Sequence, residues 1–133
     1  MLEILQINSP GRNAMMDITS LVSRKIQDSG IKNGLCLLHV PHTTAGIIVN
    51  EGADPAVMDD IIASLDRLVP RQAGYKHDEG NSAAHIKAIL VGGRTFLMIE
   101  GGRLMLGTWE HIFFCEFDGP RTRKVHVKIM ETP

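Results

Sequence analysis

The segment from Thr122 to Met130 constrains the fold more than any other part of the chain. Its residues alternate between apolar and basic, with Val125, Val127 and Ile129 set against Lys124, His126 and Lys128. This two-residue period is typical of a β-strand with one face buried and one face exposed. The chain is therefore expected to build a sheet.

Other short apolar segments, bounded by turn residues, predict the remaining strands. The segment GLCLLHV, from Gly34 to Val40, is apolar on both faces and is expected to be a central strand. Ser9-Pro10-Gly11 and Gly101-Gly102 are turn signals. The other predicted strands are Leu2–Ile7, Ala45–Val49, Arg94–Glu100, Leu104–Leu106 and His111–Phe117.

Three segments carry helix signals. Asp17 is expected to cap a helix that ends at Gly30, because glycine adopts the left-handed conformation at low cost. Asp54-Pro55 predicts a second helix, which Pro70 stops. A third helix opens at Asn81 or Ser82 and ends at Gly92-Gly93. The predicted buried stripe of the second helix is Val57, Met58, Ile61, Ile62, Leu65 and Leu68.

Length and element order together predict a single α+β domain over residues 1–133, with a mixed or antiparallel sheet and about three helices. The net charge of −1 gives no global field that would attract nucleic acid or an acidic membrane. Met1 leads into LEILQIN without a signal-peptide pattern, which favours a cytoplasmic location. Cys36 and Cys115 lie in apolar segments and are expected to be buried thiols, with a disulfide between them left open.

Polar residues that a scaffold does not require gather at four places. Thr43 and Thr44 follow His42 between two apolar strands. At Asn50-Glu51, with Asp54 close behind, a strand ends and a helix begins, and such a junction favours anions. The other two places are a loop and helix with His77, Asn81 and His85, and a DGP turn followed by Arg121 and Arg123.

Spacing suggests how the residues of the last two places are directed. Asn81 and His85 are four residues apart and share a helix face if the helix reaches back to Asn81. Arg121 and Arg123 are two residues apart, so on a strand they would point to the same side. We therefore expect the two arginines to anchor an anionic ligand with planar, charge-assisted contacts.

Each place also has a purely structural interpretation. Asp54 is explained by its role as an N-cap, and the arginines by a solvated strand end. His39 and His126 are interpreted as hydrogen-bonded scaffold residues, whereas His111 fits either role. Taken together, the imidazoles and carboxylates are typical ligands of zinc and related divalent metals, although their spacing matches no standard zinc signature. The residues alone predict a shared metal or anion site.

Three segments, HTTAGIIVNEGADP, YKHDEGNSAAHIKA and GGRLMLGTWEHIFFCEFDGPRTRKV, resemble the YjbQ-like family, often described as secondary thiamine-phosphate synthase enzymes. The motifs occur in the family's order and cover essentially the whole chain. The resemblance implies a compact α+β subunit that assembles as a homotrimer. It also implies a site built from His42, Asn50, Glu51, Asp54, His77, Asn81, His85, Gly107, Trp109, Arg121 and Arg123.

Roles within this implied site follow from residue type. His42, His77 and His85 are expected to hold one divalent ion, zinc or magnesium. The expected catalytic groups are Asn50, Glu51, Asp54, Asn81, Arg121 and Arg123. The two arginines are also expected to contact substrate, together with Thr43, Thr44, Gly107, Trp109 and Glu110. Glu110 stands where the family commonly has glutamine, and an anion there would disfavour phosphate nearby.

The reaction implied by the resemblance joins hydroxymethylpyrimidine diphosphate to thiazole phosphate and releases pyrophosphate. Only Tyr75 and Trp109 are aromatic residues of the site motifs, so we expect low efficiency. A metal-dependent hydrolase or phosphatase is one alternative. A non-catalytic trimer that binds a small anion is the other, and the sequence has no nucleophilic serine, cysteine or lysine motif.

The segment LMLGTWEHIFFCEF suggests the same assembly on other grounds. It has more apolar surface than one small domain easily covers. We therefore expect a stable homotrimer with the site at or near the subunit boundary.

Overall fold

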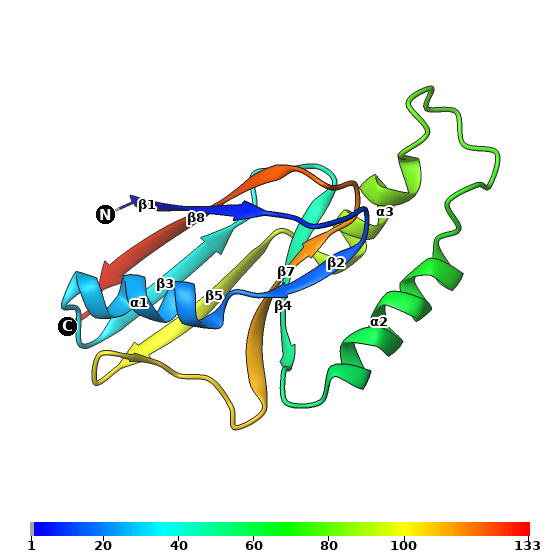
Figure 1. Ribbon diagram of the computed structural model, residues 1–133. Helices are drawn as coiled ribbons and strands as arrows, with labels where there is room; N and C mark the ends of the chain where they lie inside the picture. The colour runs from blue at the N-terminus through cyan, green and yellow to red at the C-terminus, as the bar shows by residue number, and fades with distance from the viewer. Residues whose placement is uncertain (1) are drawn as a thin grey trace.

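The structure is a computed structural model that describes residues 2–133, with strands and helices interleaved along the chain (Figure 1). The strands are β1 (Leu2–Asn8), β2 (Ala14–Asp17), β3 (Gly34–His39), β4 (Ala45–Glu51), β5 (Arg94–Glu100), β6 (Arg103–Leu104), β7 (Glu110–Glu116) and β8 (Thr122–Glu131). The helices are α1 (Thr19–Ser29), α2 (Pro55–Leu68) and α3 (Ser82–Val91). The predicted α+β class with three helices is confirmed.

Two antiparallel sheets form the scaffold. The larger sheet has the strand order β1-β8-β3-β5-β6, and the smaller has the order β2-β7-β4. Every pairing within them is antiparallel. The sequence did not predict β2, because its four residues are too short to show a period. Pairing of Met16 with Phe114 on β7 extends this segment as a strand.

The core lies on one face of the larger sheet. Val125, Val127 and Ile129 are buried and Lys124 and Lys128 are exposed, so the predicted alternation of β8 is confirmed. Helix α1 packs on this face through Val22 and Ile26, beside the fully buried Phe114 of β7. Both cysteines are buried free thiols, and burial raises the pKa of Cys36 to about 11 and that of Cys115 to about 12.

Two of the predicted helix caps, Asp54 and Gly30, are confirmed, and the third, Asp17, is displaced by one residue. Asp54 caps α2 by accepting a hydrogen bond from the Ala56 N–H at 3.0 Å. Gly30 ends α1 with φ of 71°. The prediction for Asp17 is wrong by one residue, because Ile18 occupies the N-cap position without a side-chain cap. Asp17 instead accepts hydrogen bonds from the backbone and hydroxyl groups of Thr19.

Helix α2 lies at one side of the molecule in Figure 1, and its predicted buried stripe is only partly covered within the subunit, where Val57, Ile61, Ile62 and Leu65 are half-buried. Met58 is its only buried residue among those described, and Leu68 is 74% exposed. Helix α3 also leaves apolar residues in solvent, including Ile89 at 79% exposure. Both helices therefore have apolar surface that the subunit does not cover.

The second face of the larger sheet is uncovered, and apolar side chains lie on it among charged ones such as Lys124 and Lys128. Its outward side chains include Phe96 at 62% and Met98 at 60% exposure, with Leu2, Ile4 and Met130. By contrast, the second part of the segment LMLGTWEHIFFCEF belongs to the core, since Ile112 to Phe117 are buried, whereas Met105 and Trp109 in its first part are exposed. Exposed apolar surface is therefore present, but it is distributed over β1, β5 and β8, over α2 and α3, and over the first part of this segment.

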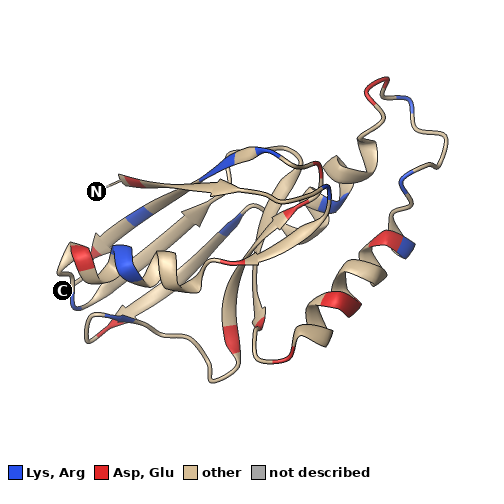
Figure 2. Cartoon of the chain, viewed as in Figure 1, with Lys and Arg blue, Asp and Glu red and all other residues tan. Residues whose placement is uncertain are grey.

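Charges are scattered over the subunit rather than gathered on one face, in keeping with the net charge of −1 (Figure 2). Across residues 2–133, none of the helices has the length and apolar character needed to span a bilayer.

Candidate functional site

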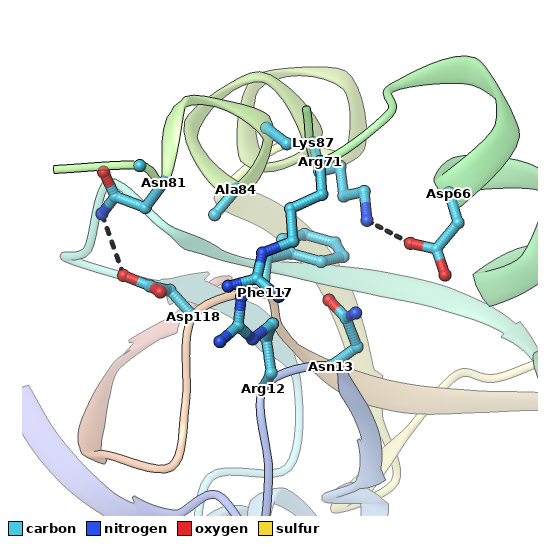
Figure 3. Close-up of a pocket in the computed structure, with 11 residues that line it drawn as sticks. Arg12, Asn13, Asp66, Arg71, Asn81, Ala84, Lys87, Phe117 and Asp118 are labelled. Carbon is cyan, nitrogen blue, oxygen red and sulfur yellow. Dashed lines mark hydrogen bonds and ion pairs between the residues drawn. The ribbon is translucent and has the colours of Figure 1, made fainter. Parts of the chain in front are cut away.

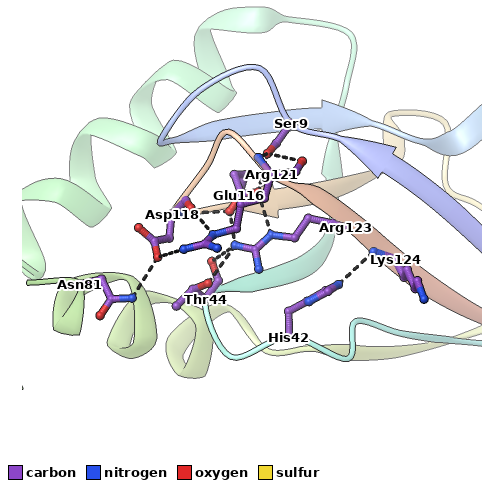
Figure 4. Close-up of polar contacts among 9 residues, drawn as sticks. All are labelled: Ser9, His42, Thr44, Asn81, Glu116, Asp118, Arg121, Arg123 and Lys124. Atoms are coloured by element: carbon purple, nitrogen blue, oxygen red, sulfur yellow. Dashed lines mark hydrogen bonds and ion pairs between the residues drawn. The ribbon is translucent and has the colours of Figure 1, made fainter. Parts of the chain in front are cut away.

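A polar cleft lies where the β3–β4 link, the β7–β8 link and the start of α3 meet (Figure 4). Its volume is about 350 Å³. The lining residues are Pro41, His42, Thr43, Thr44, Glu79, Asn81, His85, Asp118, Arg121 and Arg123. The structure thus brings together residues from three of the four places that the sequence singled out.

A buried ion pair forms the back of this cleft. Arg123 donates from Nε to Glu116 Oε1 at 2.8 Å and from Nη2 to Glu116 Oε2 at 2.5 Å. Its Nη2 also donates to Thr44 Oγ1 at 2.8 Å, and the Ser9 hydroxyl donates to Glu116 Oε1 at 2.6 Å. Burial by itself would raise the pKa of Glu116, but the hydrogen bonds from Arg123 and Ser9 outweigh it and hold that pKa below its ordinary value.

This pairing changes the role expected for Arg123. Its side chain is 6% exposed and that of Glu116 is 0% exposed, so the Nε and Nη2 donors are committed inside the subunit. Arg123 still lines the cleft, and an anchoring contact from it to a ligand anion stays a prediction. Glu116 escaped the sequence reasoning because a single glutamate in the apolar segment FFCEF carries no spacing signal.

Arg121 lies at the mouth of the cleft. It precedes β8 and is exposed, whereas Arg123 is buried, yet both arginines line the same cleft, as their spacing predicted. Arg121 Nη2 lies 3.1 Å from Asp118 Oδ2, and Asn81 Nδ2 donates to the same oxygen at 2.9 Å. Burial would raise the pKa of Asp118, but hydrogen bonds from Asn81 and Arg121 outweigh it and lower that pKa.

Asn81 also carries an unsatisfied group. Its Oδ1 atom is buried and has no hydrogen-bond partner among residues 2–133. A buried amide oxygen normally accepts a hydrogen bond. The side chain therefore offers an acceptor beside the cleft, and a hydroxyl or amino group of a ligand can donate to it.

His42 is held in one neutral form by the sheet. Its Nε2 accepts a hydrogen bond from the Lys124 N–H at 2.9 Å, so the neutral ring carries its proton on Nδ1. Burial and the nearby charge of Arg123 lower the pKa of His42. His42 can therefore offer a hydrogen-bond donor to the cleft, whereas its Nε2 is not free to bind a metal.

The other two predicted metal ligands lie close to each other. The rings of His77 and His85 are 5.6 Å apart between centroids and nearly perpendicular. However, no three His, Cys, Asp or Glu side chains within residues 2–133 are arranged to hold a metal ion. His42, His77 and His85 therefore lie near one another without forming a preformed metal centre in the single subunit, and an ion shared by them stays a prediction.

The remaining predicted residues form a second group at the opposite end of the smaller sheet. Along the β4–β7 pair, Ala45 lies opposite Glu116, whereas Glu51 lies opposite Glu110. Six residues of strand separate these positions by about 20 Å. The second group contains Asn50, Glu51, Asp54, Gly107, Trp109 and Glu110.

Side chains of this second group mostly make local contacts. Glu110 Oε1 accepts from the Gly107 N–H at 2.8 Å, which closes the turn before β7. Asn50 Oδ1 accepts from the Glu51 N–H at 2.7 Å. Trp109 is 62% exposed. Within one subunit Glu110 is therefore remote from the cleft, and its charge cannot disfavour phosphate there as the sequence suggested.

Acid is expected to weaken the fold through the carboxylates of the cleft. The pKa values of Glu116 and Asp118 are lowered from ordinary values of 4.5 and 3.8, so their stabilising contribution is complete above these values and is lost as pH falls through the lower folded-state values. We expect the thermal midpoint to fall steadily below about pH 4.5. Glu116→Gln should flatten this dependence, as measured by thermal unfolding across a pH series. Glu131→Gln, at the exposed end of β8, is the control, and equal slopes in the two variants would contradict the assignment.

The fold and the cleft define a class of small α+β protein, with a candidate site at one end of a three-stranded antiparallel sheet. The chain belongs to the UPF0047 protein YjbQ-like family, whose model matches residues 3–132. This confirms the resemblance found in the sequence.

Curated relatives and solved structures agree with this assignment. The chain is 48% identical to the UPF0047 protein YugU of Bacillus subtilis over 131 residues, covering 98% of this chain and 99% of the relative. A YjbQ/UPF0047 family structure from Clostridium acetobutylicum is 48% identical, with a TM-score of 0.94 and coverage of 96% and 99%. A structure from Sulfolobus solfataricus is 32% identical, with a TM-score of 0.95 and coverage of 99% and 97%. The fold is thus shared along nearly the whole chain.

Proposed function

We propose that this chain is a cytoplasmic enzyme acting on small phosphorylated substrates, and that its reaction is a low-efficiency thiamine-phosphate synthesis. The observation that carries the proposal is the cleft itself. His42, Thr43 and His85 stand around one polar space with Arg121 at its mouth, in front of the rigid Arg123–Glu116 pair. Polar groups that converge on a cavity backed by a fixed scaffold are typical of a small-molecule site.

The side chains of the cleft have distinct proposed tasks. Arg121 and His85 would contact the departing diphosphate, while the Nδ1–H of neutral His42 donates a hydrogen bond. The unsatisfied Oδ1 of Asn81 would accept from the amino group of the pyrimidine. This proposal does not require a metal ion bound by protein side chains. Magnesium would enter as the counter-ion of the diphosphate substrate.

We further propose that the protein assembles as a homotrimer. Phe96 and Met98 lie on an uncovered sheet face, and the apolar residues of α2 and α3 also lack cover. Exposed apolar surface of this extent is typical of subunit interfaces. An assembly can also bring the second group, which includes Glu51 and Trp109, from one subunit to the cleft of a neighbour.

The proposed reaction is tested by rescue of growth. Overexpression should restore growth without thiamine in a cell that lacks its main thiamine-phosphate synthase, and His85→Ala should abolish this rescue. Gln27→Ala, which changes an exposed polar residue of α1 outside the cleft, should retain it. Folding of each variant is checked by circular dichroism and its assembly by sedimentation.

The same experiment separates the alternatives. A hydrolase would release phosphate or alcohol from simple esters with the same dependence on His85, and would not rescue growth. A binding protein would do neither, yet its thermal midpoint would rise with ligand. A folded wild-type protein that fails to rescue growth and fails to form thiamine phosphate in vitro would refute the synthase proposal.

A further inference from the structure

A second cavity adjoins the cleft and shares Asn81 and Asp118 with it (Figure 3). Its volume is about 260 Å³. The residues that matter here are Arg12 from the β1–β2 loop, Arg71 from the loop after α2, Ala84 and Lys87 from α3, and Phe117. Apart from Asn81 and Asp118, which line both spaces, none of its residues belongs to the candidate functional site.

Two positive charges in this cavity are uncompensated. Figure 3 shows that the guanidinium groups of Arg12 and Arg71 are directed into it from two different loops. Within residues 2–133, neither side chain has a carboxylate oxygen within 4.0 Å or makes a hydrogen bond. Because like charges repel, two guanidinium groups that converge on one space favour an anion between them.

The carboxylates around the cavity are already engaged. Asp66 pairs with the buried Lys87, and Asp118 accepts from Asn81 and Arg121. Each of these negative charges is therefore matched by a cation other than Arg12 or Arg71. The charges of Arg12 and Arg71 therefore leave the cavity with a net positive charge.

The first turn of α3 adds to this potential. Ala83 and Ala84 line the cavity, and no side chain caps the helix. The first N–H groups of a helix have no partner within it and carry partial positive charge. An anion held by the two arginines would also lie near this helix end.

One wall of the cavity is apolar. The ring of Phe117 is buried, and Lys87 Nζ lies 5.9 Å from its centroid, so the ring is fixed between α3 and the cavity. Ala84 packs beside it. The cavity thus combines a cationic rim with an apolar wall, which suits a phosphate carried on a small organic group better than a bare ion.

We propose that this cavity is a second ligand site that binds a small phosphate monoester, with its phosphate between Arg12 and Arg71 and its organic group against Phe117. Guanidinium groups bind phosphate oxygens through paired, charge-assisted hydrogen bonds. The site shares only Asn81 and Asp118 with the cleft, and the proposal does not depend on which reaction the cleft performs.

Phenyl phosphate is the probe, since it joins a monoester to an aromatic group, and inorganic phosphate is the comparison. Isothermal titration calorimetry in a phosphate-free buffer should show saturable binding to the wild-type protein, tighter for phenyl phosphate. Arg12→Gln and Arg71→Gln should each weaken binding by about tenfold or more, because each removes half of the guanidinium pair. Arg24→Gln, which removes an exposed arginine of α1 outside the cavity, should leave affinity unchanged.

Three results would overturn the proposal. One is the absence of saturable binding, and another is an equal loss of affinity in Arg24→Gln. The third is loss of binding in His85→Ala with full retention in Arg71→Gln, which would place the ligand in the cleft. Binding is measured without turnover, so the result is independent of the growth-rescue test.

Discussion

Replacing Arg123 with methionine is expected to lower the free energy of unfolding by about 3–5 kcal/mol. Methionine keeps much of the side-chain volume but removes every donor that faces Glu116 and Thr44. The carboxylate of Glu116 would remain fully buried, with only the Ser9 hydroxyl and the Asp118 N–H to satisfy it. An unpaired buried charge is far more costly than the loss of a surface pair.

Urea denaturation at fixed protein concentration measures this effect. Arg121→Met is the matched control, since it removes an exposed arginine from an ion pair two residues away and should cost no more than about 1 kcal/mol. The double variant Arg123→Met/Glu116→Leu should recover much of the loss, because it removes both charges together. Equal stabilities of wild type and Arg123→Met, or no recovery in the double variant, would show that the pair is not a structural element.

Replacing Phe96 with glutamate is expected to convert a trimer into monomers. Phe96 lies opposite Leu37 on the uncovered face of the larger sheet, with Met98 two residues further along β5. In the proposed assembly this face is covered by another subunit. A carboxylate placed there would have to lose its hydration without a partner, and three copies would do so together.

Sedimentation equilibrium at micromolar concentration gives the mass directly. Wild type should have three times the 14.6 kDa subunit mass, and Phe96→Glu the subunit mass alone. Leu21→Glu places the same charge on an exposed apolar residue of α1, away from this face, and should stay trimeric. A monomeric wild-type protein, or a Phe96→Glu variant that still sediments as a trimer, would rule out this interface.

The residues predicted to form one site lie in two separate groups within the subunit. Motif order along the chain suggested one site, because His42 and Glu51 belong to the same short segment. A strand of seven residues lies between them, and extended backbone carries the two ends about 20 Å apart. If the trimer forms, the second group can act only from a neighbouring subunit or in a different role.

Local signals in the sequence were enough to determine most elements of this protein. The alternation from Thr122 to Met130 predicted β8, Asp54-Pro55 predicted the start of α2, and Gly30 predicted the end of α1. Each of these depends on side-chain period or on backbone conformation within a few residues. Such preferences are present in the chain before any distant contact forms.

Tertiary structure alone decided which polar groups meet. The partner of Arg123 is Glu116 because the β7–β8 link brings the end of one strand beside the start of the next, where both side chains are buried together. Strand β2 forms because its residues pair with β7. Arg12 and Arg71 line one cavity because two loops meet there, although the two residues are 59 positions apart in the sequence. Contacts of this kind depend on sheet register and loop closure, and residue spacing does not encode either of them.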